Sequence, residues 1–256
     1  MRVGIIGVGN IGSIIAKVLL KQGYELHLVN RHVDKLRKFE GLAHTYLEVE
    51  KLPELDALFL CVKPQDAIGA LKKVPSYRTK RLLISTVTGV TIGEIASYVN
   101  DDVVRIMPNI PISIGKGVIG ISYCKECLNR KGDVQSLLSP FGKLVEVDES
   151  LFPAVTALSG SGPAFIFVII ESLVDAGLKL GLSYETAMKL TIETFRGSSD
   201  LLEKEGKHPG ELRHVVTSPA GTTIEGIYSL EREGLRGIIM KTIFDTYKRA
   251  VELQNS

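Results

Sequence analysis

The sequence Gly7-Val8-Gly9-Asn10-Ile11-Gly12 stands between an apolar run at residues 2–6 and an amphipathic pattern that ends at Gly23. A second apolar run follows at residues 25–30, so the stretch joins a predicted strand, a helix and a second strand. Glycines at this spacing allow a tight turn, close approach of a pyrophosphate to the backbone, and close packing of the helix on the strand. Because they lie in a complete βαβ unit, we predict a dinucleotide site there.

The second predicted strand ends in Asn30-Arg31-His32. An Asp or Glu at this place would hydrogen-bond the ribose 2′-hydroxyl and favour NAD. An arginine can instead pair with a 2′-phosphate through two charge-assisted hydrogen bonds. We therefore expect NADP as cofactor, with NADPH preferred and NAD possible, held in part by Asn30 and Arg31. The alternative is that Arg31 is an ordinary exposed charge.

The alternation of strands and helices continues to about residue 150. Strands are expected at 56–62, 81–85, 103–107, 117–122 and 143–147, with helices between most of them. This order predicts a parallel sheet whose ligands lie outside the carboxyl ends of the strands. We assign three strand ends to that crevice: Val62-Lys63-Pro64, Thr86 to Gly89, and Pro108-Asn109. Lys63 is expected beside the nicotinamide ribose, and a catalytic role for it is the alternative.

From about Ser150 the chain shows helical periods and no convincing strand, so we predict an N-terminal domain at 1–150 and a helical domain at 151–256. Residues 159–163 are expected to be a flexible segment before a helix at 164–180. The first turns of that helix are apolar on nearly all sides, which one small helical domain would not bury. We therefore interpret the helix as a subunit interface. Its longest apolar run, seven residues, is far shorter than a membrane span.

The composition is that of a globular protein, with 45% apolar and 23% charged residues and a net charge of +2. This charge gives no reason to expect nucleic acid or an acidic membrane as partner. The three cysteines, Cys61, Cys124 and Cys127, form neither a disulfide framework nor a zinc site. We interpret the C-x-x-C spacing as incidental, with a local disulfide or a redox role as alternatives. No signal peptide is apparent, and we expect a cytoplasmic protein.

A second polar stretch stands out in the helical half, Val216-Thr217-Ser218-Pro219-Ala220-Gly221-Thr222-Thr223-Ile224-Glu225. A turn that leads into a helix offers free N–H groups and the positive end of the helix dipole, and both favour an anion. We expect this turn to hold a substrate carboxylate. His208 and His214 are more typical of surface or packing histidines than of a catalytic base. A substrate that is already electrophilic, such as a protonated imine, fits this chemistry.

The same residues resemble the signature of pyrroline-5-carboxylate reductases, and the resemblance extends over the whole chain. It is carried by these stretches: Gly7–Gly12, Val62–Gln65, Arg105–Pro111, Ala157–Ala164, Val215–Ile227 and Leu230-Glu231. The chain departs from the family at Ala220, where a second glycine is common, and at Thr86-Val87-Thr88-Gly89, where small alanines are common. If the φ angle of Ala220 is positive, the turn is strained.

The resemblance implies an NAD(P)-dependent oxidoreductase that reduces the C=N bond of 1-pyrroline-5-carboxylate to L-proline, the last step of proline biosynthesis. It implies that Thr223 hydrogen-bonds the ring nitrogen and that Ser218, Gly221 and Thr222 hold the carboxylate. It places Thr156 near the substrate. The cofactor residues that follow from the resemblance and the sheet are Gly7, Val8, Gly9, Asn10, Ile11, Gly12, Asn30, Arg31, Val62, Lys63, Pro64 and Thr88, with no metal.

The family resemblance also implies a Rossmann-type domain followed by an all-helical dimerisation domain, with homodimers that often assemble into decamers. Two other functions compete. A β-hydroxyacid dehydrogenase would need a lysine early in the first long helix, but none occurs there before Lys179. A non-enzymatic NADP sensor would not need the Ser218–Thr223 turn.

Overall fold

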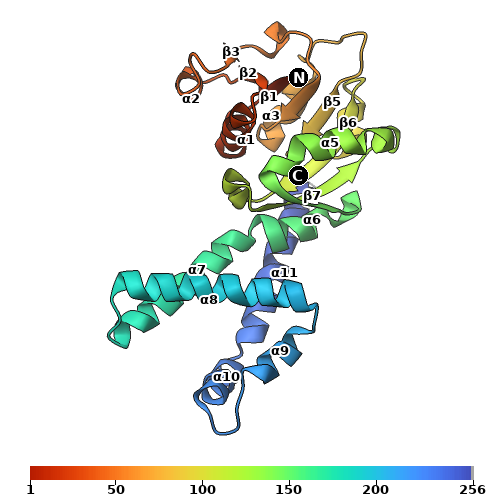
Figure 1. The fold of residues 1–256 in the computed structure, drawn as a ribbon. Helices are drawn as coiled ribbons and strands as arrows, with labels where there is room; N and C mark the ends of the chain where they lie inside the picture. Colours follow the sequence, from red (N-terminus) through yellow and green to blue (C-terminus); the bar gives the residue numbers. More distant parts are fainter. Residues whose placement is uncertain (255–256) are drawn as a thin grey trace. The chain divides into compact units, whose positions relative to one another are not determined.

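The computed structural model describes residues 1–254 and divides the chain into two compact units (Figure 1). The sheet unit comprises Met1–Ser161 together with the chain from Thr246 onward. The helical unit comprises Gly162–Asp245.

An eight-stranded sheet forms the centre of the sheet unit, in the order β3-β2-β1-β4-β5-β6-β7-β8. Its strands are β1 (Arg2–Ile6), β2 (Glu25–Val29), β3 (His44–Tyr46), β4 (Ala57–Leu60), β5 (Leu82–Ser85), β6 (Asp102–Pro108), β7 (Gly117–Tyr123) and β8 (Gly142–Glu146). The sequence did not predict β3, whose three residues carry no apolar alternation. The prediction of a parallel sheet is wrong at one pair, because β7 runs antiparallel to β6. The connection between them holds only a short 3-10 turn, η2 (Ile110–Ile114), and a parallel crossover needs a longer connection.

Helices cover both faces of the sheet, so the central strands are buried on both sides. The helices of this unit are α1 (Asn10–Lys21), α2 (Val33–Arg37), α3 (Pro64–Leu71), α4 (Ile92–Ala96), α5 (Lys131–Leu138) and α6 (Phe152–Val155). Successive residues of β4 contribute to two separate cores: Phe59 packs in one core with residues of α1 and α5, and Leu58 packs in the other with residues of α3 and α4. This layering confirms the predicted Rossmann-type α/β domain.

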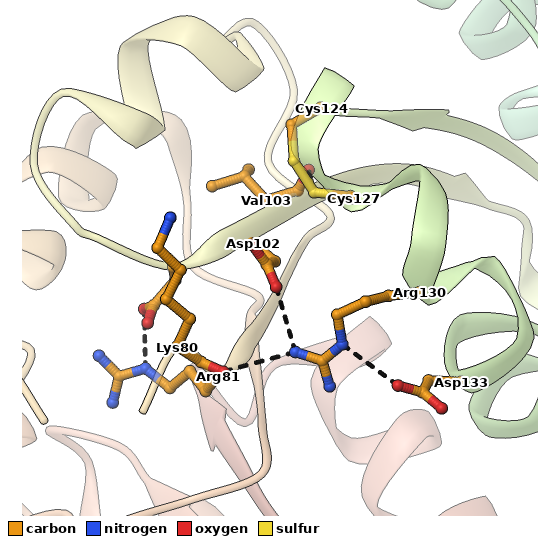
Figure 2. Close-up of polar contacts among 9 residues, drawn as sticks. Lys80, Arg81, Asp102, Val103, Cys124, Cys127, Arg130 and Asp133 are labelled. Atoms are coloured by element: carbon orange, nitrogen blue, oxygen red, sulfur yellow. Dashed lines mark hydrogen bonds and ion pairs between the residues drawn. A yellow bond between two sulfur atoms is a disulfide. The ribbon is translucent and has the colours of Figure 1, made fainter. Parts of the chain in front are cut away.

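A polar cluster anchors the chain at the amino end of β6 (Figure 2). Arg130 donates to a carboxylate oxygen of Asp102 at 3.3 Å and to one of Asp133 at 3.2 Å. Cys124 and Cys127 are joined by a disulfide, and the Cys127 Sγ lies 3.2 Å from the carbonyl oxygen of Val103. Of the three interpretations of the C-x-x-C stretch, the structure therefore has the local disulfide. Because it lies at the amino end of β6, it is remote from the edge where a parallel sheet binds ligands.

The sheet unit extends beyond residue 150, because the next turns of helix pack on the sheet. Phe152 is buried, and the guanidinium of Arg105 lies 4.5 Å from its ring centroid. Glu149 accepts a hydrogen bond from Arg105 at 3.0 Å and another from the N–H of Ile92 at 2.7 Å. Residues Thr156–Gly160 form a π-helical turn. The segment predicted to be flexible, 159–163, contains the end of this turn, a bend at Ser161 and the first residues of α7 (Gly162–Lys179).

The helical unit confirms the predicted helices. They are α7 (Gly162–Lys179), α8 (Tyr184–Glu205), α9 (Pro209–Val215), α10 (Thr222–Arg232) and α11 (Leu235–Gln254). The last residues of α11, from Thr246, belong to the sheet unit. The hydroxyl of Ser183 accepts from the N–H of Thr186 and caps α8, as predicted. Helices α7 and α8 approach closely where a Cβ on Gly177 would lie 2.9 Å from that of Ala187.

Large apolar side chains remain exposed along the helical unit, including Phe167 at 61% and Met240 at 71%. Among the described residues one helical stretch, Glu149–Lys179, is long and apolar enough to cross a membrane by length and composition alone. Its mean hydropathy is 1.7, and 11% of the apolar window is buried. The seven-residue run seen in the sequence thus belongs to a longer apolar helix, whose exposed surface needs a partner.

Candidate functional site

Three glycines shape the loop between β1 and α1. Gly7 has a φ of +95°, and a Cβ there would lie 2.6 Å from the carbonyl oxygen of Cys61. A Cβ on Gly12 would lie 2.0 Å from the carbonyl oxygen of Gly7. A Cβ on Gly9 meets nothing within 4 Å, so the second glycine faces open space. Two glycines are therefore needed for the fold of the loop, and the middle one leaves room for a ligand.

A cavity of about 530 Å³ opens beside this loop and lies wholly in the sheet unit. Six of the sequence-predicted cofactor residues line it: Gly7, Gly9, Asn30, Arg31, Val62 and Lys63. Val8 is buried in the core and Pro64 begins α3, so neither side chain lines the cavity. Asn10, Ile11 and Gly12 form the first turn of α1, whose N-terminus has no side-chain cap. Its free N–H groups are suited to a pyrophosphate.

Arg31 is engaged by a carboxylate that the sequence analysis missed. Its two terminal nitrogens donate to the two oxygens of Asp66 at 3.2 Å and 3.3 Å. Its Nε donates to His32 Nε2 at 3.3 Å. The Arg31 side chain is 68% exposed, so this ion pair is worth about 0–1 kcal/mol. An incoming phosphate dianion could therefore displace Asp66 at little cost.

Two lysines add positive charge to the same cavity, and the sequence analysis did not single them out. Lys35 of α2 lines it, a few residues after Arg31, and no ion pair of Lys35 is seen in the described chain. Lys73 also lines it and pairs with Glu50 at 3.2 Å. Hydrogen bonds of the Glu50 carboxylate, first with its own backbone and second with Lys73, lower the pKa of the Glu50 carboxyl. The spacing from Arg31 to Lys35 was the signal available in the sequence.

Cys61 forms part of the cavity wall beneath the glycine loop. Burial raises the pKa of its thiol to about 12, against a smaller opposing effect of a hydrogen bond with Thr86. The thiol is therefore protonated at neutral pH and adds no negative charge where phosphates would bind.

Two further predicted residues, Thr88 and Thr156, lie in turns of the sheet unit. Thr88 stands in the turn after β5, next to Gly89, whose φ is +83°. Thr156 opens the π-helical turn, and its hydroxyl donates to the carbonyl oxygen of Phe152 at 2.8 Å. That turn packs against Met107 near the carboxyl end of β6. Because the Thr156 proton is already used, its hydroxyl is available to a ligand mainly as an acceptor.

The turn before α10 lies in the helical unit and is locally well defined. The N–H of Gly221 donates to the carbonyl oxygen of Ser218 at 3.1 Å, so this N–H is not free for an anion. The Thr217 hydroxyl donates to the carbonyl oxygen of Arg213 at 2.6 Å. No side chain caps α10, which leaves its first-turn N–H groups open. Thr222 and Thr223 begin the helix with exposed side chains.

Ala220 is the only residue other than glycine with a positive φ in the described part of the chain, at 55°. An L-residue in the left-handed region costs about 1–2 kcal/mol, because its Cβ crowds the following carbonyl oxygen. The φ angle of Ala220 is thus positive, the case in which a strained turn was expected, and the turn is strained. Strain of this kind concentrates at ligand-binding turns.

Comparison with known proteins matches both units to described families. Residues 149–253 match the family described as "Pyrroline-5-carboxylate reductase dimerisation", and residues 2–89 match "NADP oxidoreductase coenzyme F420-dependent". A pyrroline-5-carboxylate reductase of Aquifex aeolicus is 38% identical over 261 residues, which is 99% of this chain and 97% of the relative. One of Methanosarcina acetivorans is 35% identical over 265 residues, 98% of this chain and 97% of the relative.

Solved structures of full length are similar as well. The pyrroline carboxylate reductase of Plasmodium falciparum, solved with NADP bound, has a TM-score of 0.89 at 28% identity and covers 99% of this chain and 98% of its own. The 1-pyrroline-5-carboxylate reductase of Streptococcus pyogenes has a TM-score of 0.88 at 30% identity, with 98% of both chains covered.

Proposed function

Because the chain belongs to the pyrroline-5-carboxylate reductase family, we propose that its two units divide the work of reducing 1-pyrroline-5-carboxylate to L-proline with NADPH. The enzyme is an NAD(P)-dependent oxidoreductase that acts on a C=N bond. In this proposal, residues 1–150 hold the cofactor, and residues 151–256 provide the substrate turn and the subunit contact.

The residues of the sheet unit fit a dinucleotide. Gly9 leaves open space at the start of α1, and the adjoining cavity of about 530 Å³ carries Arg31 and Lys35. In this assignment the first turn of α1 binds the pyrophosphate, Arg31 and Lys35 bind the 2′-phosphate, and Lys63 lies beside the nicotinamide ribose. The bound cofactor supplies the hydride. Val62 in the cavity wall, with Pro64 at the start of α3 and Thr88 after β5, is assigned to the placing of the nicotinamide ring.

The observation that carries the substrate assignment is the uncapped N-terminus of α10 with its exposed hydroxyls. The first-turn N–H groups and the Ser218 and Thr222 hydroxyls are suited to the substrate carboxylate, because all of them donate hydrogen bonds. Gly221 contributes the shape of the turn rather than a free N–H. The Thr223 hydroxyl is assigned to the ring nitrogen, and Thr156 to an accepting contact with the substrate.

Positioning accounts for most of the catalysis in this proposal. Fixing the carboxylate fixes the ring, and orientation of two bound reactants contributes roughly 7–11 kcal/mol in favourable cases. Thr223 can accept a hydrogen bond from the iminium N–H and donate one to the product amine. The imine nitrogen itself carries the proton, so no separate side-chain acid is needed.

The exposed apolar helices of the helical unit coincide with the match to the dimerisation family, so the enzyme is a homo-oligomer. We further propose a homodimer formed through α7, with a decamer as the possible larger assembly, in the cytoplasm. Light scattering distinguishes a dimer from a decamer.

Thr223→Ala tests the catalytic assignment. We expect turnover to fall by roughly one to two decades, the scale of one positioned hydrogen bond. Thr223→Ser retains the hydroxyl and serves as the matched control, with turnover near that of the wild type. The assay follows NADPH oxidation with 1-pyrroline-5-carboxylate, with a 3-hydroxyacid and NADP as the negative substrate pair. Unchanged turnover in Thr223→Ala removes Thr223 from the mechanism.

Substitutions at Arg31 and Asp66 test the cofactor assignment, because they are expected to change the KM for NADPH in opposite directions. Arg31→Ala is expected to raise the KM for NADPH at least about tenfold, through loss of a charge-assisted pair with the 2′-phosphate. Asp66→Asn frees Arg31 and is expected to lower that KM by up to about fivefold, the value of an exposed ion pair. The KM for NADH stays within about twofold in both variants, since NADH has no 2′-phosphate. Equal effects on the two cofactors contradict the assignment.

A further inference from the structure

Three potential metal ligands meet at the edge of the sheet formed by β2 and β3. Glu25 and His27 lie two residues apart on β2 and therefore point to the same face. His44 on β3 pairs directly with His27 in the strand register. One ligand atom of each of the three residues lies within 4.8 Å of the other two. Neither the cofactor cavity nor the substrate turn includes any of them.

The distances suit one small cation. Glu25 Oε1 lies 3.1 Å from His27 Nε2 and 3.8 Å from His44 Nε2. In a tetrahedral zinc site, bonds of about 2.0–2.1 Å put neighbouring ligand atoms about 3.3 Å apart. The present spacings bracket that value, so small side-chain shifts of the exposed Glu25 and His44 would close the site.

His27 is already oriented as a metal ligand. Its ring is buried, its Nδ1 lies 3.0 Å from the hydroxyl of Tyr46, and its Nε2 faces Glu25. A histidine ligand commonly uses its second nitrogen for such a hydrogen bond, which fixes the tautomer and the ring plane. Tyr46 lies on the same face as His44, two residues along β3. Two short strands thus provide three potential ligands and, in Tyr46, a hydrogen-bond partner that orients His27.

We propose that Glu25, His27 and His44 form a site for a divalent transition metal of the zinc type, with a fourth position open to water. Two imidazoles and one carboxylate favour zinc and its neighbours over magnesium or calcium, which prefer oxygen ligands. The Glu25 carboxylate offsets one positive charge of the ion. The metal would join β3, a three-residue edge strand, to β2.

The position of the site gives it a structural consequence for the cofactor cavity. The N–H of Asn30, just after β2, donates to the carbonyl oxygen of Tyr46 at 3.1 Å. The chain then continues through Leu47, Glu48, Val49 and Glu50, all of which line the cavity. Fixing β3 on β2 would steady this wall. The metal takes no part in hydride transfer.

Metal binding to the untagged, chelator-treated, full-length protein tests the proposal, with Co²⁺ as spectroscopic probe and Zn²⁺ as competitor. We expect one Co²⁺ per chain with the visible absorption of a four-coordinate ion, displaced by Zn²⁺. His44→Ala and Glu25→Gln each remove an exposed ligand, and both should lower the affinity at least about tenfold. Tyr46→Phe should lower it about tenfold through loss of the supporting hydrogen bond. Zn²⁺ should also raise the Tm of the wild type but not of His44→Ala.

His32→Ala is the matched control, since His32 is an exposed histidine of the same unit outside the cluster. Its affinity for Co²⁺ should equal that of the wild type. Reductase activity of the metal-free protein should be retained, which separates this proposal from the assigned activity. The proposal is overturned if His44→Ala binds Co²⁺ as tightly as the wild type, or if the wild type shows no stoichiometric binding.

Discussion

The sheet unit buries most of its large apolar side chains within one chain, whereas the helical unit leaves many of its own exposed. In the sheet unit, two apolar cores enclose the central strands, and residues such as Phe59 and Leu58 are fully buried within one chain. In the helical unit, Val174 is one of the few buried apolar side chains, and Phe167 on the same helix is 61% exposed. The cavity beside the glycine loop is lined by the sheet unit alone, whereas the helical unit leaves a large apolar surface exposed.

This difference separates the two functions physically. In the proposed function, dinucleotide binding depends on a loop in which Gly7 and Gly12 are fixed by close contacts inside one unit. The proposed subunit contact and the proposed substrate turn belong to helices that a single chain leaves exposed. Substitutions in the glycine loop should therefore act on folding or on cofactor binding, and substitutions on the exposed apolar face of α7 should act through assembly.

Gly12→Ala is expected to have the largest effect, because its Cβ would lie 2.0 Å from a backbone oxygen of Gly7 that cannot move freely. Overpacking of this kind costs about 1–3 kcal/mol or more, so we expect loss of NADPH binding together with a lower free energy of unfolding. Urea denaturation and fluorescence titration with NADPH measure the two effects.

Gly9→Ala is the matched control for the same loop, since its Cβ meets nothing within 4 Å. Its free energy of unfolding should stay within about 1 kcal/mol of the wild type, because only a helix N-cap residue changes. NADPH binding should still weaken at least about tenfold, because the added methyl group occupies the space of the pyrophosphate. Normal NADPH binding in Gly9→Ala would show that the cofactor does not approach this loop.

Phe167→Glu probes the helical unit. A charge placed on the exposed apolar face of α7 should raise the dimer dissociation constant at least about a hundredfold, because an unpaired charge is costly to bury. Reductase activity should fall with the dimer, while NADPH affinity stays within about threefold. Light scattering and NADPH titration report the two quantities. Lys204→Glu, an exposed charge change on α8, should leave the assembly intact. A fully active dimer of Phe167→Glu contradicts the assignment of this face.

Ala220→Gly should have the smallest effect, and we expect it to raise the free energy of unfolding. Glycine removes the Cβ penalty at a φ of 55°, about 1–2 kcal/mol, against a loss of about 0.5–1 kcal/mol from the more flexible unfolded chain. The expected net gain in the free energy of unfolding is about 0–1.5 kcal/mol. Ala176→Gly, inside α7, should instead lose about 1 kcal/mol. Urea denaturation at equal protein concentration distinguishes the two, and a loss in Ala220→Gly rules out strain at this turn.

Most of the fold followed from local patterns in the sequence. The β1–α1–β2 unit was predicted from the glycine spacing, because steric contacts at Gly7 and Gly12 are local and leave few alternatives. Helices α8 to α11 were predicted from apolar periods and caps such as Ser183. Two features were missed for identifiable reasons. β3 is too short to show a pattern, and the turn at Thr156–Gly160 is helical because it packs on the sheet despite its small residues.

By itself, the sequence determined the class of fold, the glycine loop between β1 and α1, and the family, because glycine sterics, helix caps and apolar periods act over short distances along the chain. The tertiary structure decided what depends on residues far apart in sequence. It paired Arg31 with Asp66, brought His44 beside His27, and turned β7 antiparallel to β6. It also gave Ala220 its positive φ, since no local rule forces an alanine into that region. These features depend on which strands and turns meet, and only the folded chain specifies that.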